Sequence, residues 1–315
     1  MERPAEAAEP PRTSPPLRID PHSGRSVVIA PRRASRPGQT RPPAEAPSEG
    51  ELESCPFCEG REERTPPEAL ALPQSSRAPD SPGWQVRVVP NLYPAFERQE
   101  VVVHSPRHVR SIVELAPDEL GVVAAAWQAR ARAAAEAGFD YVHALVNEGR
   151  AAGATLAHSH SQLVWLREVP PLPAREQALS AGRCVLCDDL ASERAEGTRV
   201  VSERDGVVSL CPAASREPYE LLVAPTRHEP DAWTSARLAT ALELLAEGWR
   251  RLRSLEGAVP ANAWLHAAPF GGEGHWHLEA LPRLTTPAGV ELGAGVFVNP
   301  LDPDAAAQAL RTATP

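Results

Sequence analysis

Short apolar runs, separated by polar and proline-rich stretches, predict the secondary structure along the chain. Strands are expected at 27–30, 84–89, 100–104, 141–147 and 162–166 in the first half and at 198–210, 219–224 and 275–281 in the second. Apolar residues recur at helical spacing over 118–138 and 236–255. Each half therefore offers several strands and one main helix, without the strand–helix alternation of a parallel sheet. This pattern predicts an α+β fold built from two antiparallel sheets.

The distribution of proline and acidic residues suggests how the chain is divided. Residues 1–16 are rich in Pro, Glu and Ala, and we expect a disordered tail there. The remainder is long enough for two domains with separate cores, predicted at 17–172 and 173–315. The stretches 37–53 and 60–83 are dense in Pro, Ser and Glu and are predicted to be loops.

Charge and composition exclude several classes of function. The net charge of -9 argues against a nucleic-acid-coating surface or an anionic membrane as partner. The sequence contains no lysine, which excludes Walker-type phosphate lysines and Schiff-base chemistry. No apolar run approaches the roughly 20 residues of a membrane helix, and the start of the chain lacks a signal-peptide core. We therefore predict a cytoplasmic protein.

Cysteine spacing brings in metal chemistry. Four of the five cysteines form two C-x-x-C pairs, and in a cytosolic chain this spacing favours metal ligation or redox work over structural disulfides. The fifth, Cys211, follows Val-Val-Ser-Leu and is interpreted as a small buried apolar residue.

Both halves carry the same three motifs in the same order, and such an internal repeat constrains the whole fold. Each copy begins with C-x-x-C, continues with an eight-position step from a glutamate to a histidine, and ends with H-x-H. The first copy contains Cys55/Cys58, Glu100 to His108 and His158/His160, and the second contains Cys184/Cys187, Glu220 to His228 and His275/His277.

Two thiolates and two imidazoles make a closed tetrahedral zinc site. The predicted ligands are Cys55, Cys58, His108 and His158 for a first zinc and Cys184, Cys187, His228 and His275 for a second. The alternative, in which the cysteines are redox-active or simply buried, leaves the repeated histidines without a role.

The H-x-H-x-Q run indicates phosphoryl chemistry. Alternate residues of a strand share a face, so His158, His160 and Gln162 are predicted to point the same way. With His158 held by zinc, a neutral His160 is free to attack an α-phosphorus and form a covalent phosphoramidate. Gln162 would orient the phosphoryl group or donate to its oxygens. The second copy has Glu279 at that position, where a carboxylate repels phosphate, so it is predicted to be structural. In the alternative interpretation both histidines bind metal.

Over residues 17–307 the chain resembles the galactose-1-phosphate uridylyltransferase family, a branch of the histidine-triad superfamily. The matching segments are Arg18–Pro37, Ser105–His108, Asn147–His158 and Ala268–His277. The resemblance implies two tandem histidine-triad-like units, zinc, and His160 as the nucleophile. It also implies a homodimer, because the family places a C-terminal loop, here Gly293 to Asn299, near the partner's active site.

The resemblance further implies substrate contacts. Arg33 and Arg36 would contact nucleotide or phosphate, Phe57 and Asn91 would lie against base and ribose, and Asn147, Thr155 and Gln162 would hold the phosphoryl oxygens. The Ser-spaced run Ala157–Gln162 and the intact second C-x-x-C resemble the branch that includes ADP-glucose phosphorylase. Leu92 stands where the galactose enzymes carry an acidic ribose contact. The other histidines are interpreted as packing or capping residues: His22, His104, His143 and His266.

The motifs indicate covalent phosphoryl chemistry, and the resemblance implies a nucleotidyltransferase that uses a nucleotide sugar and a sugar 1-phosphate in carbohydrate metabolism, of the UDP-glucose–hexose-1-phosphate uridylyltransferase type. The alternatives are ADP-glucose phosphorylase, with phosphate as the acceptor, and a dinucleoside polyphosphate phosphorylase or hydrolase. A non-enzymatic zinc-ribbon module is disfavoured by the acidic residues around both pairs: Glu51, Glu53, Asp188 and Asp189.

Overall fold

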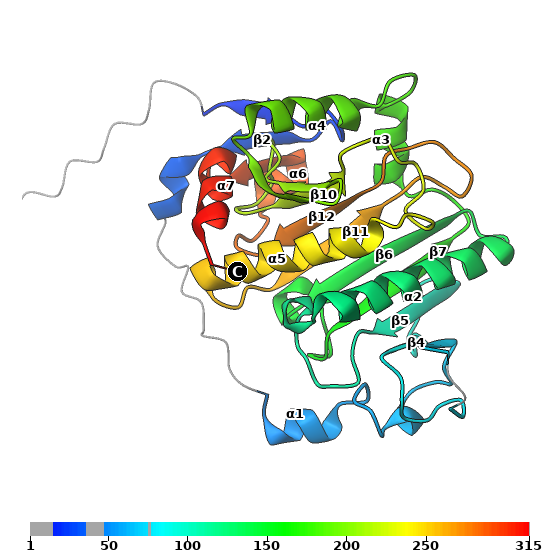
Figure 1. Ribbon diagram of the computed structural model, residues 1–315. Helices are drawn as coiled ribbons and strands as arrows, with labels where there is room; N and C mark the ends of the chain where they lie inside the picture. The colour runs from blue at the N-terminus through cyan, green and yellow to red at the C-terminus, as the bar shows by residue number, and fades with distance from the viewer. Residues whose placement is uncertain (1–14, 36–46, 75–76, 315) are drawn as a thin grey trace, which may run out of the picture.

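The computed structural model describes residues 15–35, 47–74 and 77–314 (Figure 1). Within this part of the chain, ten strands form one sheet in the order β3-β4-β5-β7-β6-β11-β12-β10-β9-β8, and every neighbouring pair is antiparallel. The strands are β3 (Leu70–Leu72), β4 (Val86–Pro90), β5 (Arg98–Val103), β6 (Tyr141–Glu148), β7 (His160–Leu166), β8 (Val200–Arg204), β9 (Val207–Leu210), β10 (Leu221–Pro225), β11 (Ala261–His266) and β12 (His277–Pro282).

The strand order is mirrored about the middle of the sheet. The sequence β4-β5-β7-β6 in the first half corresponds to β9-β10-β12-β11 in the second, and the halves meet where β6 pairs with β11. The predicted α+β class with antiparallel sheets is therefore confirmed. The two sheets form one continuous sheet, because each half covers an edge strand that the other would otherwise leave exposed.

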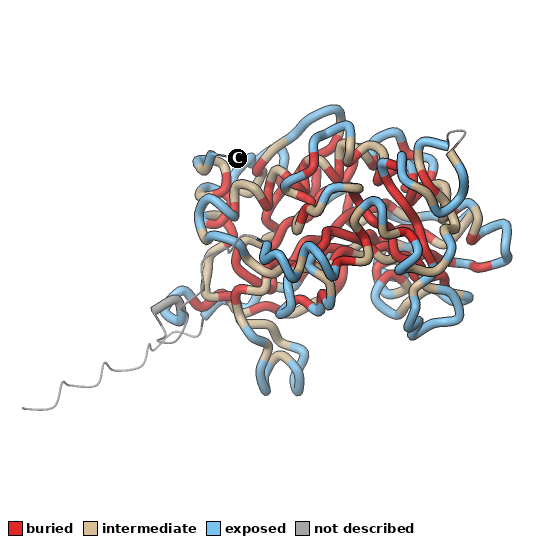
Figure 2. Tube along the Cα trace, turned by 90° about the horizontal axis from the view of Figure 1, so that it is seen from below, coloured by how far each residue is buried: buried red, intermediate tan, exposed pale blue. Residues whose placement is uncertain are grey.

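Both long helices lie side by side on one face of this sheet (Figure 1). They are α2 (Pro117–Glu136) and α5 (Leu238–Glu256), close to the predicted bounds. Leu120 and Trp127 of α2 share one apolar core with Leu242 and Leu245 of α5. This buried layer runs through the middle of the molecule (Figure 2).

The opposite face of the sheet is covered by separate segments. Val101 and Val103 alternate with Val102, which faces the helices, and they pack against Cys55 and Phe57. Over the second half lie α4 and a small sheet in which β2 pairs antiparallel with β1 and parallel with β13. The bounds of these and the remaining elements are α1 (Glu49–Ser54), α3 (Pro171–Leu179), α4 (Val185–Glu196), α6 (Gly289–Ala294), α7 (Pro303–Thr312), β1 (Leu17–Ile19), β2 (Ser26–Ile29), β13 (Val296–Asn299) and the 3-10 turns η1 (Pro31–Ser35), η2 (Glu62–Arg64), η3 (Ile112–Glu114) and η4 (Arg150–Ala152).

Several local predictions were wrong. The single strand expected at 198–210 is a hairpin, because Asp205 and Gly206 have positive φ angles of 51° and 75° and turn the chain. Parts of the predicted loops are ordered: α1 is capped by the Ser48 hydroxyl, and β3 extends the sheet. The elements α3, α4 and β11 were not predicted.

The predicted tail lies almost wholly outside the described residues, and the domain boundary at 172 stays a prediction. In the described part of the chain, no helix is both long and apolar enough to span a bilayer.

Candidate active site and metal centres

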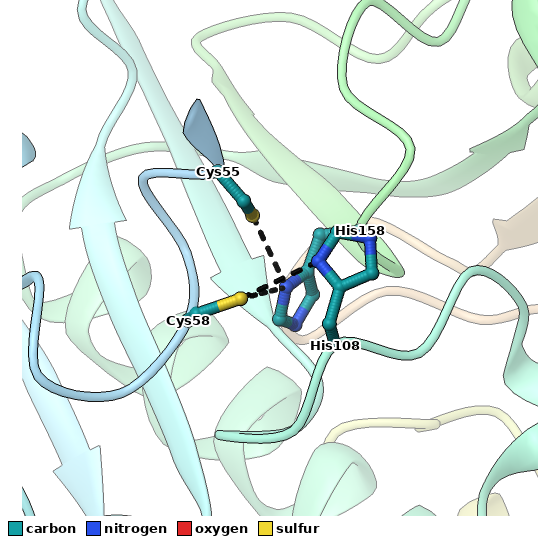
Figure 3. A group of neighbouring side chains, drawn as sticks. All are labelled: Cys55, Cys58, His108 and His158. Carbon is teal, nitrogen blue, oxygen red and sulfur yellow. Dashed lines mark hydrogen bonds between the residues drawn. The ribbon is translucent and has the colours of Figure 1, made fainter. Parts of the chain in front are cut away.

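Four predicted metal ligands from three separate segments point toward one another (Figure 3). Cys55 and Cys58 follow α1, His108 lies after β5, and His158 precedes β7. The distance from Cys55 Sγ to His158 Nδ1 is 3.5 Å, and Cys58 Sγ lies 3.3 Å from His108 Nδ1 and 3.7 Å from His158 Nδ1. One donor atom from each residue lies within 4.8 Å of the others, so the group could hold a metal ion.

The outer nitrogen of each imidazole is also held, and this fixes which nitrogen faces the sulfur atoms. His158 Nε2 donates to the Ser105 carbonyl at 2.9 Å, and His108 Nε2 donates to Glu51 Oε1 at 2.8 Å. Arg110 donates to the same carboxylate and lowers the pKa of Glu51 to about 2, so that the group is ionised. Such outer partners orient metal ligands and fix their tautomers. This role of Glu51 was not predicted.

The second set of predicted ligands repeats this geometry. Cys187 Sγ lies 3.3 Å from His275 Nδ1 and 3.6 Å from His228 Nδ1, and Cys184 Sγ lies 3.7 Å from His275 Nδ1. His275 Nε2 donates to the Pro225 carbonyl at 3.0 Å, three positions before His228, as Ser105 precedes His108. The internal repeat thus extends to individual hydrogen bonds. All five cysteines are free thiols, and Cys211 is fully buried, as predicted.

His160 stands beside the first ligand group and outside it. It opens β7 opposite Val103, and only 7% of its surface is exposed. Its Nδ1 donates to the His158 carbonyl at 2.8 Å, so Nε2 is the nitrogen with the free lone pair. Burial lowers the pKa of His160, which keeps the ring neutral near pH 7. Phe57 contacts both imidazoles, with ring centroids 5.5 Å from His160 and 6.1 Å from His158.

Two amide side chains lie on the same face of the sheet. Gln162, two residues after His160, accepts a hydrogen bond at Oε1 from Gln99 Nε2 at 2.5 Å. Asn147 of β6 accepts at Oδ1 from Asn262 Nδ2 of β11 at 2.7 Å. Each amide oxygen is engaged, so each amide nitrogen remains as the donor. Neither partner could be predicted from the sequence, because cross-strand register decides both contacts.

The other predicted substrate residues occupy different surroundings. Thr155 is exposed and lines a cavity of about 360 Å³ beside Cys55 and His158. Asn91 is half-buried at the start of the loop from β4 to β5, where its Oδ1 accepts the Tyr93 N–H at 2.9 Å. Arg33 is exposed in η1, after the strand that pairs with β13. Arg36 lies outside the described residues.

Similarity to known proteins agrees with this arrangement. Residues 93–171 match the family model described as galactose-1-phosphate uridyl transferase, N-terminal domain. Galactose-1-phosphate uridylyltransferase of Thermotoga maritima is 28% identical over 94% of this chain and 97% of its own length. ADP-glucose phosphorylase of Arabidopsis thaliana is 28% identical over 95% of this chain and 93% of its own. A crystal structure of the Arabidopsis enzyme with bound ADP-glucose has a TM-score of 0.82, at 28% identity, over 96% of this chain and all of that one.

The chain is thus similar over nearly its whole length to a galactose-1-phosphate uridylyltransferase and to an ADP-glucose phosphorylase.

In this protein the second half diverges at the position equivalent to Gln162. The Glu279 carboxylate lies 2.9 Å from Arg25 and 2.8 Å from Arg216. Although desolvation opposes ionisation, Arg216 and Arg25 hold the pKa of Glu279 well below its ordinary value. The side chain is therefore committed to ion pairs, and a fixed negative charge stands where the first half has a neutral amide.

A buried network missed by sequence analysis surrounds Glu176 of α3. Its carboxylate accepts from His266 Nδ1 at 2.9 Å, and it lies 3.5 Å from His22 Nε2 and 4.0 Å from His277 Nε2. Glu176, His266 and His277 form, together with Glu279, a third group that could hold a metal ion. His22 and His266, predicted to pack or cap, thus face a charged carboxylate.

His143 is expected to make this protein sensitive to acid. Desolvation, aided by the nearby His266, lowers the pKa of His143 from 6.5 to about 4. Between pH 6.5 and about 4, His143 is protonated in the unfolded chain and neutral in the folded one. The unfolded chain therefore binds more protons, and the free energy of unfolding falls as the pH drops below about 6.5. Lowering the pH from 7 to 5 should remove about 2 kcal/mol through this residue. Urea unfolding of wild type and His143→Gln at both pH values measures the difference, and equal pH dependence in the two proteins would contradict it.

Proposed function

We propose that this protein transfers a nucleoside monophosphate from a nucleotide sugar to a phosphorylated acceptor through a covalent nucleotidyl-His160 intermediate. One observation carries the proposal: a buried, neutral imidazole whose Nδ1 is bound by the His158 carbonyl and whose Nε2 lone pair is free. The similarity to the Thermotoga and Arabidopsis enzymes over nearly the whole chain supports the same chemistry.

The reaction runs as two displacements at one phosphorus. His160 Nε2 attacks the α-phosphorus, a P–N bond forms, and the bond from phosphorus to the bridging oxygen breaks with departure of the sugar 1-phosphate. An oxygen of the acceptor phosphate then attacks the same phosphorus, and the P–N bond breaks to return neutral His160. The imidazole becomes positive in the intermediate, and the Nδ1–H bond to the His158 carbonyl strengthens as it does so.

Neighbouring side chains have supporting roles in this proposal. The amide nitrogens of Gln162 and Asn147 donate to the phosphoryl oxygens, where charge accumulates in the transition state. The ring of Phe57 packs against the nucleophile and restricts its orientation. Thr155, Asn91, Arg33 and Arg36 remain predicted substrate contacts.

We propose zinc as the ion at both Cys2His2 groups. Bonds of about 2.3 Å to sulfur and about 2.0–2.1 Å to nitrogen in a tetrahedron separate S and N by about 3.6 Å. The S–N distances of 3.3 to 3.7 Å in both groups fit this value. When bound, zinc would supply a structural clamp that joins the loops bearing Cys55, Cys58 and His108 to the start of β7.

For the substrate, we propose ADP-glucose as the donor and inorganic phosphate as the acceptor. The Ser-spaced H-x-H run and the match to the Arabidopsis enzyme over nearly the whole of both chains support adenylyl transfer. The near-complete match to the Thermotoga enzyme supports a second candidate, transfer of uridylyl from UDP-glucose to a hexose 1-phosphate. A homodimer in the cytoplasm stays a prediction.

Trapping the intermediate tests this proposal. The zinc-loaded protein is incubated with ADP-glucose, UDP-glucose or diadenosine tetraphosphate, each labelled in the α-phosphate, and then denatured. We expect label from ADP-glucose, released as ADP when inorganic phosphate is added. Label from UDP-glucose alone would overturn the choice of nucleotide, label from the dinucleotide alone would favour the polyphosphate enzymes, and no label from any donor would reject the function.

A further inference from the structure

Gln99, a half-buried residue near the start of β5, contacts Gln162 across the sheet. Gln162 pairs in register with Val101, so Gln99 is its diagonal neighbour on the same face. We propose that Gln99 is a positioning residue that fixes the Gln162 amide with its nitrogen available to the phosphoryl group. This inference rests on the proposed function.

The direction of each hydrogen bond follows from a backbone group. The N–H of Ala95 can only donate, and it lies 2.9 Å from Gln99 Oε1, so this end of the Gln99 amide must be oxygen. The other end is then the NH2 group, which donates to the nearest atom of Gln162 at 2.5 Å. That atom must be the Gln162 oxygen. A peptide N–H therefore sets, through one intermediate side chain, which end of Gln162 is left to donate.

Gln99 also holds the loop that joins β4 to β5. Its own carbonyl accepts the Asn91 N–H at 2.8 Å, and its side chain accepts the Ala95 N–H. This loop presents Leu92, Tyr93 and Phe96 to solvent, with exposed fractions of 63%, 85% and 50%. One residue thus links the loop predicted to meet the nucleotide with the amide predicted to meet its phosphate.

The substitution Gln99→Glu tests the direction of these bonds. A carboxylate still accepts from Ala95 N–H and has nearly the same shape, but it cannot donate to Gln162. The Gln162 amide must then rotate, offering its nitrogen to the carboxylate and its oxygen to the phosphoryl group. The rate of His160 labelling in a single turnover should fall about 100-fold, the effect of losing one preorganised donor. Gln99→Leu leaves the Gln162 amide free to adopt either orientation and should lower the labelling rate only about twofold to tenfold.

Three comparisons separate positioning from general damage. In a Gln162→Ala background, Gln99→Glu should lower the labelling rate by less than about a further twofold, because the Gln162 amide that it would turn is absent. The ratio of Gln99→Glu to wild-type rate should rise as the pH approaches about 4–5, where a protonated carboxyl donates again. The exposed Gln85, changed to Glu, is the matched control and should label at the wild-type rate.

The outcomes also distinguish this inference from the proposed function. If wild type forms no nucleotidyl-protein, the function itself fails. The positioning role is overturned if Gln99→Glu is labelled as fast as wild type. It is also overturned if Gln99→Glu lowers the labelling rate as much in the Gln162→Ala background as in wild type. Zinc content and the thermal unfolding midpoint of each variant identify any loss that comes from misfolding.

Discussion

Replacing His160 with glycine is expected to abolish nucleotidyl transfer while the metal content of the protein stays unchanged. The side chain removed is the only attacking group in the proposed mechanism, and Gln162 and Asn147 cannot form the intermediate in its place. Loss of a nucleophile of this kind costs on the order of 10⁴-fold or more in turnover. Steady-state assays, covalent labelling and elemental analysis of the same sample measure both parts of the result.

His277 offers a matched control, because it occupies the same position of the motif in the second half. It makes the same type of bond, from Nδ1 to the His275 carbonyl at 3.3 Å. His277→Asn should keep the ability to form the labelled intermediate. Loss of one metal equivalent in the His160 variant would place that residue among the ligands, and retained labelling would remove it from the mechanism.

Changing Cys55 and Cys58 together to alanine is expected to release one zinc per chain and to slow transfer by about 100-fold or more. Mutation even of residues that only hold a metal ligand in place typically lowers metal affinity or activity 10- to 100-fold. The loss should be large because these cysteines position His158, whose carbonyl in turn holds His160. The thermal midpoint should fall as well, since Cys55 packs with Phe57 in the apolar cluster against β5.

The second Cys2His2 group gives the comparison for this experiment. Cys184→Ala with Cys187→Ala should release the other zinc and lower the thermal midpoint, yet retain most of the transfer activity. The second half is not expected to take part in the transfer, because Glu279, at the position equivalent to Gln162, forms ion pairs with Arg25 and Arg216. Equal loss of activity from either pair would show that the halves contribute alike, contrary to the structural role proposed for the second.

Much of the architecture was predictable because its signals are local or repeated. The apolar spacing of Leu120, Val123 and Trp127 marks α2, and short runs of apolar residues mark β6 and β7. The metal groups were predictable for a different reason. C-x-x-C and H-x-H recur in the same order in both halves, with the same eight-position step from a glutamate to a histidine between them, so four ligands per site could be assigned without knowing the loops that join them.

The remaining features depend on register and long-range packing. The Gln99–Gln162 bond exists because β5 and β7 pair with Val101 opposite Gln162, which no local pattern encodes. The network around Glu176 joins α3 to three segments far away in the sequence. One missed element was predictable in principle, because the pair Asp205-Gly206 is a strong hairpin signal.

The pairing of β2 with β13 constrains the order in which the polypeptide folds. Ser26 of β2 lies beside Val296 of β13, which comes far later in the sequence, so this side of β2 stays unpaired until β13 has been synthesised. Until then the row of backbone groups on that side of β2 has no strand to pair with. We therefore expect the small sheet to close after the central sheet has assembled, and to contribute more to stability than to the early speed of folding.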